Sequence, residues 1–122
     1  MSPLSRQSAG AIAAAVSSGR TTAYAVAQET LSRLEAYDAV QPQVWISRAG
    51  ANEILAAARV VDERVAAGED LRLAGVPFAV KDNIDVQGFE TTAACPAFAY
   101  TPETSATAVV KLLEAGAICV GK

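Results

Sequence analysis

The sequence predicts an α/β fold in which N-terminal helices pack on part of a mixed sheet. Three observations predict it: helical periodicity dominates residues 1–70, short apolar runs follow residue 70, and a helical segment separates two of these runs. Alternation of strands and helices is typical of α/β sheets. With 122 residues, of which 52% are hydrophobic, the chain is long enough to bury a core. We expect residues 1–122 to form one domain or one part of a domain.

Two helices are expected before residue 40. The alanine-rich residues 8–18 favour a short helix that ends at Gly19, and Thr21 or Thr22 can cap the helix that follows. In that second helix, apolar side chains recur every three or four residues, which predicts one buried face. These side chains are Tyr24, Ala27, Leu31, Leu34 and Tyr37.

A strand and a third helix are expected between residues 42 and 68. Pro42 interrupts the helical pattern, and residues 44–47 are short, branched and aromatic, which favours a strand. Residues 51–67 have helical periodicity and end at Gly68. Their expected buried face consists of Ile54, Leu55, Ala58, Val61 and Val65.

The pattern changes to strands and turns after residue 70. The apolar residues 76–80 predict a buried strand, and residues 84–86 predict a short second strand. Residues 91–101 have no clean period and are expected to form a packed loop, after which Ser105 can cap a last helix. Residues 117–120 predict a final strand. Three or four strands are fewer than a large doubly wound sheet has, so the sheet is expected to be incomplete.

Composition excludes several classes of function. The net charge of −3 provides no positive field for nucleic acid, and no apolar run is long enough for a signal peptide or a membrane span. We expect a soluble, cytoplasmic protein that binds neither nucleic acid nor membrane and needs no cofactor. The two cysteines, Cys95 and Cys119, come without partner ligands for a metal, so we expect both to be buried as small hydrophobic side chains.

Lys81 is the candidate catalytic residue. The chain has no histidine, so acyl-transfer chemistry needs another base, and a partly desolvated lysine is the usual substitute. Strand alternation places Lys81 and the small Ala79 on one face, which leaves room beside the amine. The alternative is that Lys81 is a solvated residue that ends an apolar strand. Cys95 is another candidate, as a nucleophile, but the chain has no histidine to activate it.

The order of motifs resembles that of the amidase signature family. The segments that carry the resemblance are GVPFAVKDNIDV at residues 75–86, the pair Thr91 and Thr92, and AGAICVGK at residues 115–122. The resemblance covers nearly the whole chain and implies the N-terminal part of an amidase signature domain. Residues 1–70 would be its mainly helical portion, and residues 71–122 a strand-turn-helix-strand unit that carries the lysine.

That resemblance implies a Ser-cisSer-Lys triad with Lys81 as the neutral base. In the family, burial disfavours the charged ammonium, one serine forms an acyl-enzyme, and the other passes protons. Both serines would lie in a Gly/Ser-rich segment, and no such segment occurs within the 122 residues. We therefore expect the chain by itself to be inactive. Asp82 and Asn83 are expected to support Lys81, and Lys122 has no assigned role because it can be a frayed end.

Residues 91–100 are most similar to the allophanate hydrolase branch, which hydrolyses urea-1-carboxylate in urea breakdown. The expected partner is thus a small-molecule amide. One alternative is an amidase similar to the glutaminase subunit of the tRNA amidotransferase. Another is a small non-catalytic interaction module, whose exposed sheet edges would favour self-association. Thr91 and Thr92 are expected mainly to bond backbone groups, with contact to an active site as the less frequent case.

Overall fold

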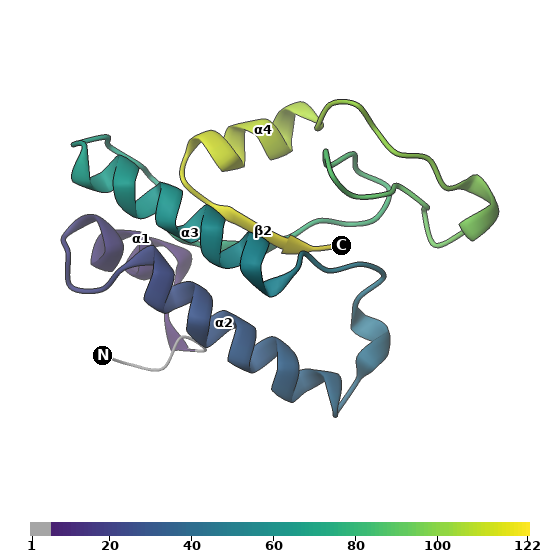
Figure 1. Cartoon of the computed structure of the whole chain (residues 1–122), viewed down its shortest axis with the longest axis horizontal. Coiled ribbons are helices and arrows are strands. Elements are labelled where there is room, and N and C mark those ends of the chain that lie inside the picture. Colours follow the sequence, from purple (N-terminus) through teal and green to yellow (C-terminus); the bar gives the residue numbers. More distant parts are fainter. Residues whose placement is uncertain (1–5) are drawn as a thin grey trace.

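The computed structural model describes residues 6–122, and its helices and strands follow the predicted order (Figure 1). The N-terminal helices come first, and two short strands that flank a helix come last. In chain order the elements are α1 (Ala9–Ser17), α2 (Ala23–Asp38), the 3-10 turn Pro42–Val44, α3 (Ala51–Ala66), β1 (Pro77–Ala79), the 3-10 turn Pro96–Phe98, α4 (Thr107–Glu114) and β2 (Ile118–Gly121).

Side-chain caps fix the starts of α1 and α2. Ser8 Oγ accepts the Ala11 amide at 3.1 Å, and Thr22 Oγ1 accepts the Ala25 amide at 3.0 Å. These bonds satisfy amides that have no partner within the helix. The capping role predicted for Thr21 or Thr22 therefore belongs to Thr22.

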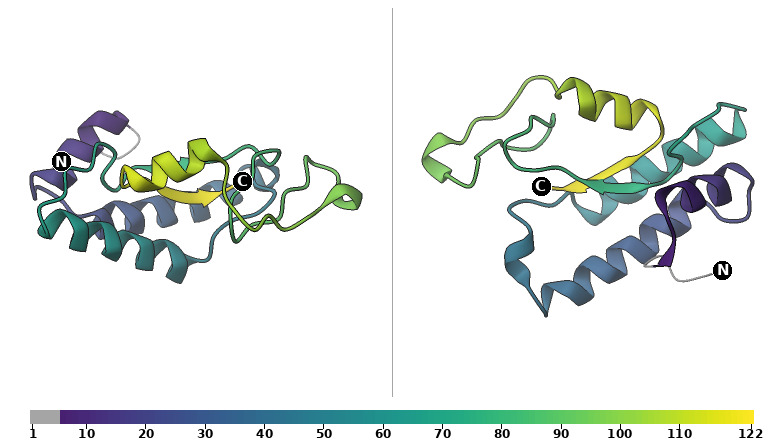
Figure 2. Two further views of the ribbon diagram at one scale, coloured as in Figure 1. Left: turned by 90° about the horizontal axis from the view of Figure 1, so that it is seen from above. Right: turned by 180° about the vertical axis from the view of Figure 1, so that it is seen from behind.

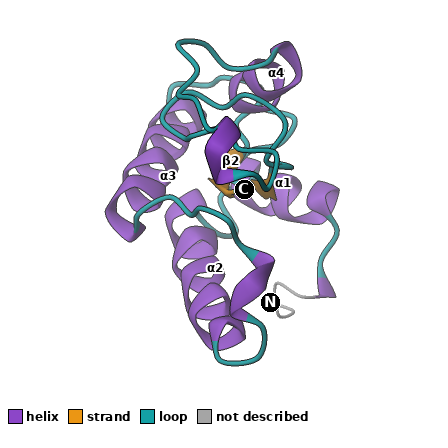
Figure 3. Ribbon diagram, turned by 90° about the vertical axis from the view of Figure 1, so that its right-hand side faces the viewer, coloured by secondary structure: helices purple, strands orange, loops and turns teal. Residues whose placement is uncertain are grey.

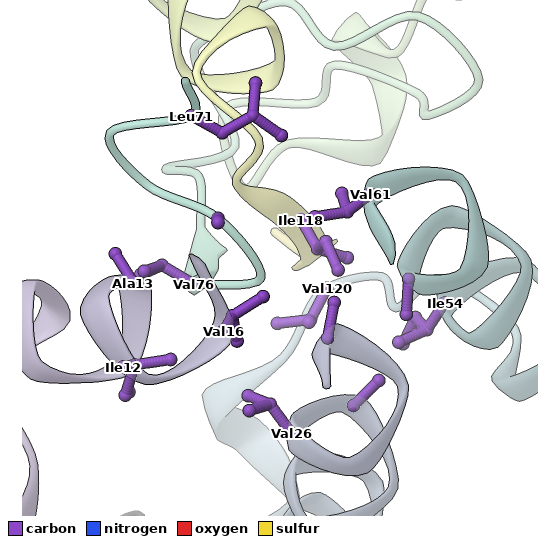
Figure 4. Close-up of a cluster of buried hydrophobic side chains, with 14 residues drawn as sticks. Ile12, Ala13, Val16, Val26, Ile54, Val61, Leu71, Val76, Ile118 and Val120 are labelled. Atoms are coloured by element: carbon purple, nitrogen blue, oxygen red, sulfur yellow. The ribbon is translucent and has the colours of Figure 1, made fainter. Parts of the chain in front are cut away.

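Helices α1, α2 and α3 enclose the larger of two hydrophobic clusters, against one face of the strands (Figures 2 and 4). Val16 from α1, Val26 from α2 and Ile54 from α3 meet in this cluster. The buried face of α2 differs from the predicted one, because Tyr37 is 46% exposed whereas Ala23 and Val26 are buried. The first two turns of α2 lie in the core, and its last turn extends beyond it.

Strands β1 and β2 pair in parallel, with Pro77 opposite Ile118, Phe78 opposite Cys119 and a register shift before Ala79. Side chains that alternate along a strand point to opposite faces. Accordingly, Ile118 and Val120 of β2 join the helical cluster, and so does Val76, which precedes β1. The other face carries a second cluster, which consists of Val80, Val86 and Val109 with Phe78, Phe89, Ala106 and Cys119 around them. The strands thus form a layer between α3 on one side and α4 on the other (Figure 3).

The predicted α/β class is confirmed, but within residues 6–122 the sheet is smaller than expected and is parallel rather than mixed. Residues 44–47 do not form a strand. Val44 ends a 3-10 turn, Trp45 is extended, and an isolated antiparallel bridge between Arg48 and Gly121 follows. Residues 84–86 do not form a strand either, because the Ile84 amide bonds back to the Lys81 carbonyl at 3.0 Å and closes a turn.

The predicted cap of α4 is also wrong. Ala106 occupies the N-cap position, and Ser105 Oγ instead accepts the Gln87 amide at 2.8 Å. Ser105 therefore joins two loops. Across the described part of the chain, no helix is both long and apolar enough to cross a membrane.

Candidate active site

Lys81 lies two residues after β1, where the strand pair ends. The Val80 amide donates to the Gly121 carbonyl at 3.0 Å, which continues the pairing up to Lys81. The Lys81 side chain is exposed, so residues 6–122 do not themselves provide the burial expected for a neutral base. It lines an open cavity of about 300 Å³, together with Ile46, Asp82, Asn83, Ala93 and Ala94.

Asp82 is buried next to this lysine and joins two segments of chain. Its Oδ2 accepts the Thr92 amide at 3.1 Å and a short hydrogen bond from the Thr92 hydroxyl. Its backbone carbonyl accepts the Ala93 amide at 3.2 Å. The expectation that Asp82 supports the Lys81 segment therefore has a physical basis, because Asp82 ties this segment to residues 92–93.

Lys122 is buried and bonded, contrary to the expectation of a frayed end. Its Nζ lies 3.2 Å from Asp82 Oδ1, and these two side chains are 0% and 4% exposed. The same ammonium donates to the Glu90 carbonyl at 3.0 Å and to Thr91 Oγ1 at 3.2 Å. Three oxygen atoms thus surround the ammonium, as many as it has N–H donors. Among the described residues, Lys122 is the cation that compensates the buried Asp82 carboxylate.

A second carboxylate, Asp85, fastens the loop that follows. Its Oδ1 accepts the Thr91 hydroxyl at 2.8 Å and the Tyr100 hydroxyl at 2.5 Å. Thr91 and Tyr100 also exchange backbone hydrogen bonds in an isolated antiparallel bridge. The loop 91–100 is therefore anchored at both ends. Its middle is exposed, so the expected packed loop is packed only at Thr91 and Thr92.

Hydrogen bonds control the ionisation of both carboxylates. The Thr92 hydroxyl, and after it Lys122, hold the pKa of Asp82 below its ordinary value against the opposing effect of burial. The Tyr100 and Thr91 hydroxyls lower the pKa of Asp85 in the same way. In return, the bond to Asp85 raises the pKa of Tyr100. Both carboxylates are therefore ionised near neutral pH.

Two alanines in the cavity wall have left-handed backbone conformations. Ala93 has a φ of 50° and Ala94 a φ of 60°. Non-glycine residues seldom adopt this region, and they do so where surrounding contacts impose it. Here the imposing contacts are the Ala93 bond to Asp82 and a bond from the Ala94 amide to Thr92 Oγ1 at 3.2 Å.

Neither cysteine is fully buried, although the sequence predicts burial for both. Cys95 is exposed, so the expectation of a buried small side chain is wrong for it, and it does not line the cavity beside Lys81. Cys119 is half-buried, and burial raises the pKa of its thiol, which opposes nucleophilic use. In residues 6–122, no group of three or more His, Cys, Asp or Glu residues could hold a metal ion.

The segment that carries this geometry matches a known family. The sequence model of the amidase family covers residues 27–122, which is most of the chain and includes all the site residues above. The chain belongs to the amidase family. Its similarity to solved amidase structures also confirms the predicted fold. The peptide amidase of Stenotrophomonas maltophilia superposes with a TM-score of 0.85 at 26% identity, over 98% of this chain and 25% of that one.

Two kinds of protein are among the relatives that this chain resembles. The glutamyl-tRNA(Gln) amidotransferase A subunit of Deinococcus deserti is 42% identical over 116 residues, 93% of this chain and 23% of that protein. Urea amidolyase of Saccharomyces cerevisiae is 50% identical over 78 residues, 64% of this chain and 4% of that protein. Allophanate hydrolase of Kluyveromyces lactis superposes with a TM-score of 0.61 at 37% identity, over 79% of this chain and 16% of that one. The chain thus spans less than a quarter of these amidase relatives.

Sequence reasoning located Lys81 but missed Lys122 and Ile46. One signal for Lys122 was present: two of the predicted strands, 76–80 and 117–120, are followed closely by a lysine. Since parallel strands end at the same edge of a sheet, two such lysines are expected near each other. Nothing in the pattern indicates that Ile46 lines the cavity, because residues 44–47 have the composition of a separate strand.

Proposed function

We propose that this chain provides the lysine base of an amidase that hydrolyses a C–N amide bond. The observation that carries the proposal is the place of Lys81, in the family-matched segment, at the end of β1 and in the wall of a cavity. A lysine base must reach a reacting hydroxyl, and an exposed amine beside a cavity has the access that this requires. Its desolvation would come from the segment that supplies the two serines.

In this mechanism the neutral Lys81 amine takes a proton from one serine, which takes a proton from the second serine as that oxygen attacks the amide carbon. The C–N bond then breaks as the Lys81 ammonium returns its proton through the first serine to the leaving nitrogen, and water hydrolyses the resulting acyl-enzyme to the acid and the free serine. The 122 residues contain a single serine after Lys81, Ser105, which is occupied by the Gln87 amide. The chain therefore contributes the base and not the nucleophile.

Allophanate is the substrate that we propose first. It is supported by the likeness of residues 91–100 to allophanate hydrolases and by the 50% identity to yeast urea amidolyase. Glutamine is a second candidate. It is favoured by the similarity of the Deinococcus deserti amidotransferase A subunit, which extends over 93% of this chain. Both candidates require Lys81, so the lysine and the substrate can be tested separately.

The test joins residues 1–122 to a C-terminal segment that carries the two serines and measures ammonia release from allophanate and from glutamine. Replacing Lys81 by alanine should lower kcat by about 10²–10⁴-fold, the usual contribution of a general base. Lys111→Ala is the matched control, because Lys111 is an exposed lysine on α4 that does not line the cavity, and it should leave kcat unchanged. Unchanged kcat in Lys81→Ala would refute the role of Lys81 as the base and would favour the alternative of a non-catalytic module.

A further inference from the structure

Lys122 is connected to every part of the cavity wall beside Lys81. The wall comes from three segments that are distant in sequence: residue 46, residues 81–83 and residues 93–94. Such a wall keeps its shape only if something holds the three segments together. Lys122 is bonded to the first segment through its backbone and is linked to the other two through its ammonium.

The backbone of Lys122 fixes the first segment. Its carbonyl accepts the amides of Ile46 at 2.9 Å and Ser47 at 3.2 Å, and its own amide donates to the Ser47 carbonyl at 2.8 Å. This approach needs a glycine at position 121, since a Cβ there would lie 2.6 Å from the Ser47 carbonyl oxygen. Ile46 is thereby held at the cavity although it belongs to no strand.

The ammonium of Lys122 fixes the other two segments through Asp82. Asp82 Oδ1 is buried without a hydrogen bond of regular geometry, so within residues 6–122 the Lys122 ammonium is the group that compensates this oxygen. With that compensation, Asp82 stays ionised and binds the Thr92 amide and hydroxyl. The left-handed Ala93 and Ala94 follow directly, and the amides of both bond to Asp82 or Thr92. Without the cation, a buried carboxylate would remain uncompensated, which is strongly unfavourable.

We propose that Lys122 is a positioning residue that holds Lys81, Ile46 and the Ala93–Ala94 backbone in one cavity wall, through its ion pair with Asp82 and its backbone pairing with Ser47. The part that concerns Lys81 rests on the proposed function. Lys122 itself does not line the cavity, so it acts through Asp82 and not on a substrate.

The main test is amide hydrogen exchange of the full chain, which does not depend on activity. Lys122→Met should speed exchange of the Thr92, Ala93 and Ala94 amides by about tenfold, in the range of coupling between contacting groups. The exchange rates of amides in the middle of α3 should stay within about twofold of their values in the unchanged chain, because Lys122 forms no bond with them. Lys111→Met is the matched control and should alter neither set.

A double variant tests whether Asp82 is the intermediary. In an Asp82→Asn background no buried negative charge needs compensation, so Lys122→Met should accelerate exchange at residues 92–94 at least about threefold less than it does alone. Equal acceleration in both backgrounds would overturn the role of Asp82. If Lys122→Met does not fold, Lys122→Arg takes its place, because it keeps the charge but moves the donors. Lys122→Arg should still accelerate exchange of the Thr92, Ala93 and Ala94 amides.

Two other results would overturn the inference. One is unchanged exchange at residues 92–94 in the Lys122 variants. The other is acceleration of α3 by the same factor, which is the signature of a purely global loss of stability. In the polypeptide that contains the two serines, Lys122→Met should also lower kcat by about tenfold. Failure of the proposed function is separately visible, since Lys81→Ala would then retain activity while the exchange results still stood.

Discussion

Gly75, which opens the lysine-bearing segment, allows close packing where a side chain would not fit. Its φ of +72° lies in the left-handed region, and its amide donates to the Gly116 carbonyl at 2.9 Å just before β1. A Cβ at this position would lie 3.0 Å from the Ala23 Cβ, 3.1 Å from the Ala23 Cα and 3.2 Å from Val16 Cγ2. We therefore predict that Gly75→Ala strains the backbone and overfills the contact with α1 and α2.

The magnitude follows from these two costs. The left-handed conformation costs an alanine about 1–2 kcal/mol. Overfilling a packed core costs about 1–3 kcal/mol more. Gly75→Ala should thus lower the free energy of unfolding by about 2–5 kcal/mol, a large share of the stability of a small domain. Gly19 has a similar φ of +79°, but no atom lies within 4 Å of the position that a Cβ would take there, so Gly19→Ala should cost about 1–2 kcal/mol, the backbone contribution alone.

Urea unfolding followed by circular dichroism measures both losses in the purified chain, and their difference isolates the packing contribution. That difference should be about 1–3 kcal/mol. If the two variants lose the same free energy within about 0.5 kcal/mol, the close packing of Gly75 against α2 is refuted. If Gly75→Ala has no effect at all, the left-handed conformation is refuted as well.

Two further predictions concern carboxylates. Asp62 of α3 accepts the first two amides of α2, Ala23 at 2.7 Å and Tyr24 at 3.0 Å, so Asp62→Ala should lower the free energy of unfolding by about 2 kcal/mol in the same assay. A loss below about 0.5 kcal/mol would contradict this capping role. The hydrogen bond from Tyr100 lowers the pKa of Asp85 in the folded chain. The ionised Asp85 carboxylate therefore stabilises the folded chain above about pH 4, and this stabilisation is lost as the pH falls through the lowered pKa of Asp85. The difference in stability between the unchanged chain and Asp85→Asn should therefore shrink from about pH 6 toward about pH 2, and a difference independent of pH would disprove the linkage.

Local sequence patterns were sufficient for the elements whose environment repeats regularly. Residues 51–67 place an apolar side chain on one face every three or four positions, and α3 forms there within one residue of the predicted end. Within the run 76–80, residues 77–79 pair with residues 118–121 as a strand, and Val76 and Val80 on either side of it belong to different apolar clusters. The two wrong strand predictions, for 44–47 and 84–86, concern short segments in which a few backbone bonds made outside a sheet outweigh local preference.

For the candidate site, the sequence by itself determined that a lysine ends an apolar strand in a chain without histidine, which made Lys81 a candidate base. Only the tertiary structure decided which lysine is buried. Lys81 remains exposed, whereas the Lys122 ammonium lies against the Glu90 carbonyl and the Asp82 carboxylate, which are 32 and 40 positions away in the sequence. The free energy of burying a charge depends on such distant partners, and no periodicity along the chain records them.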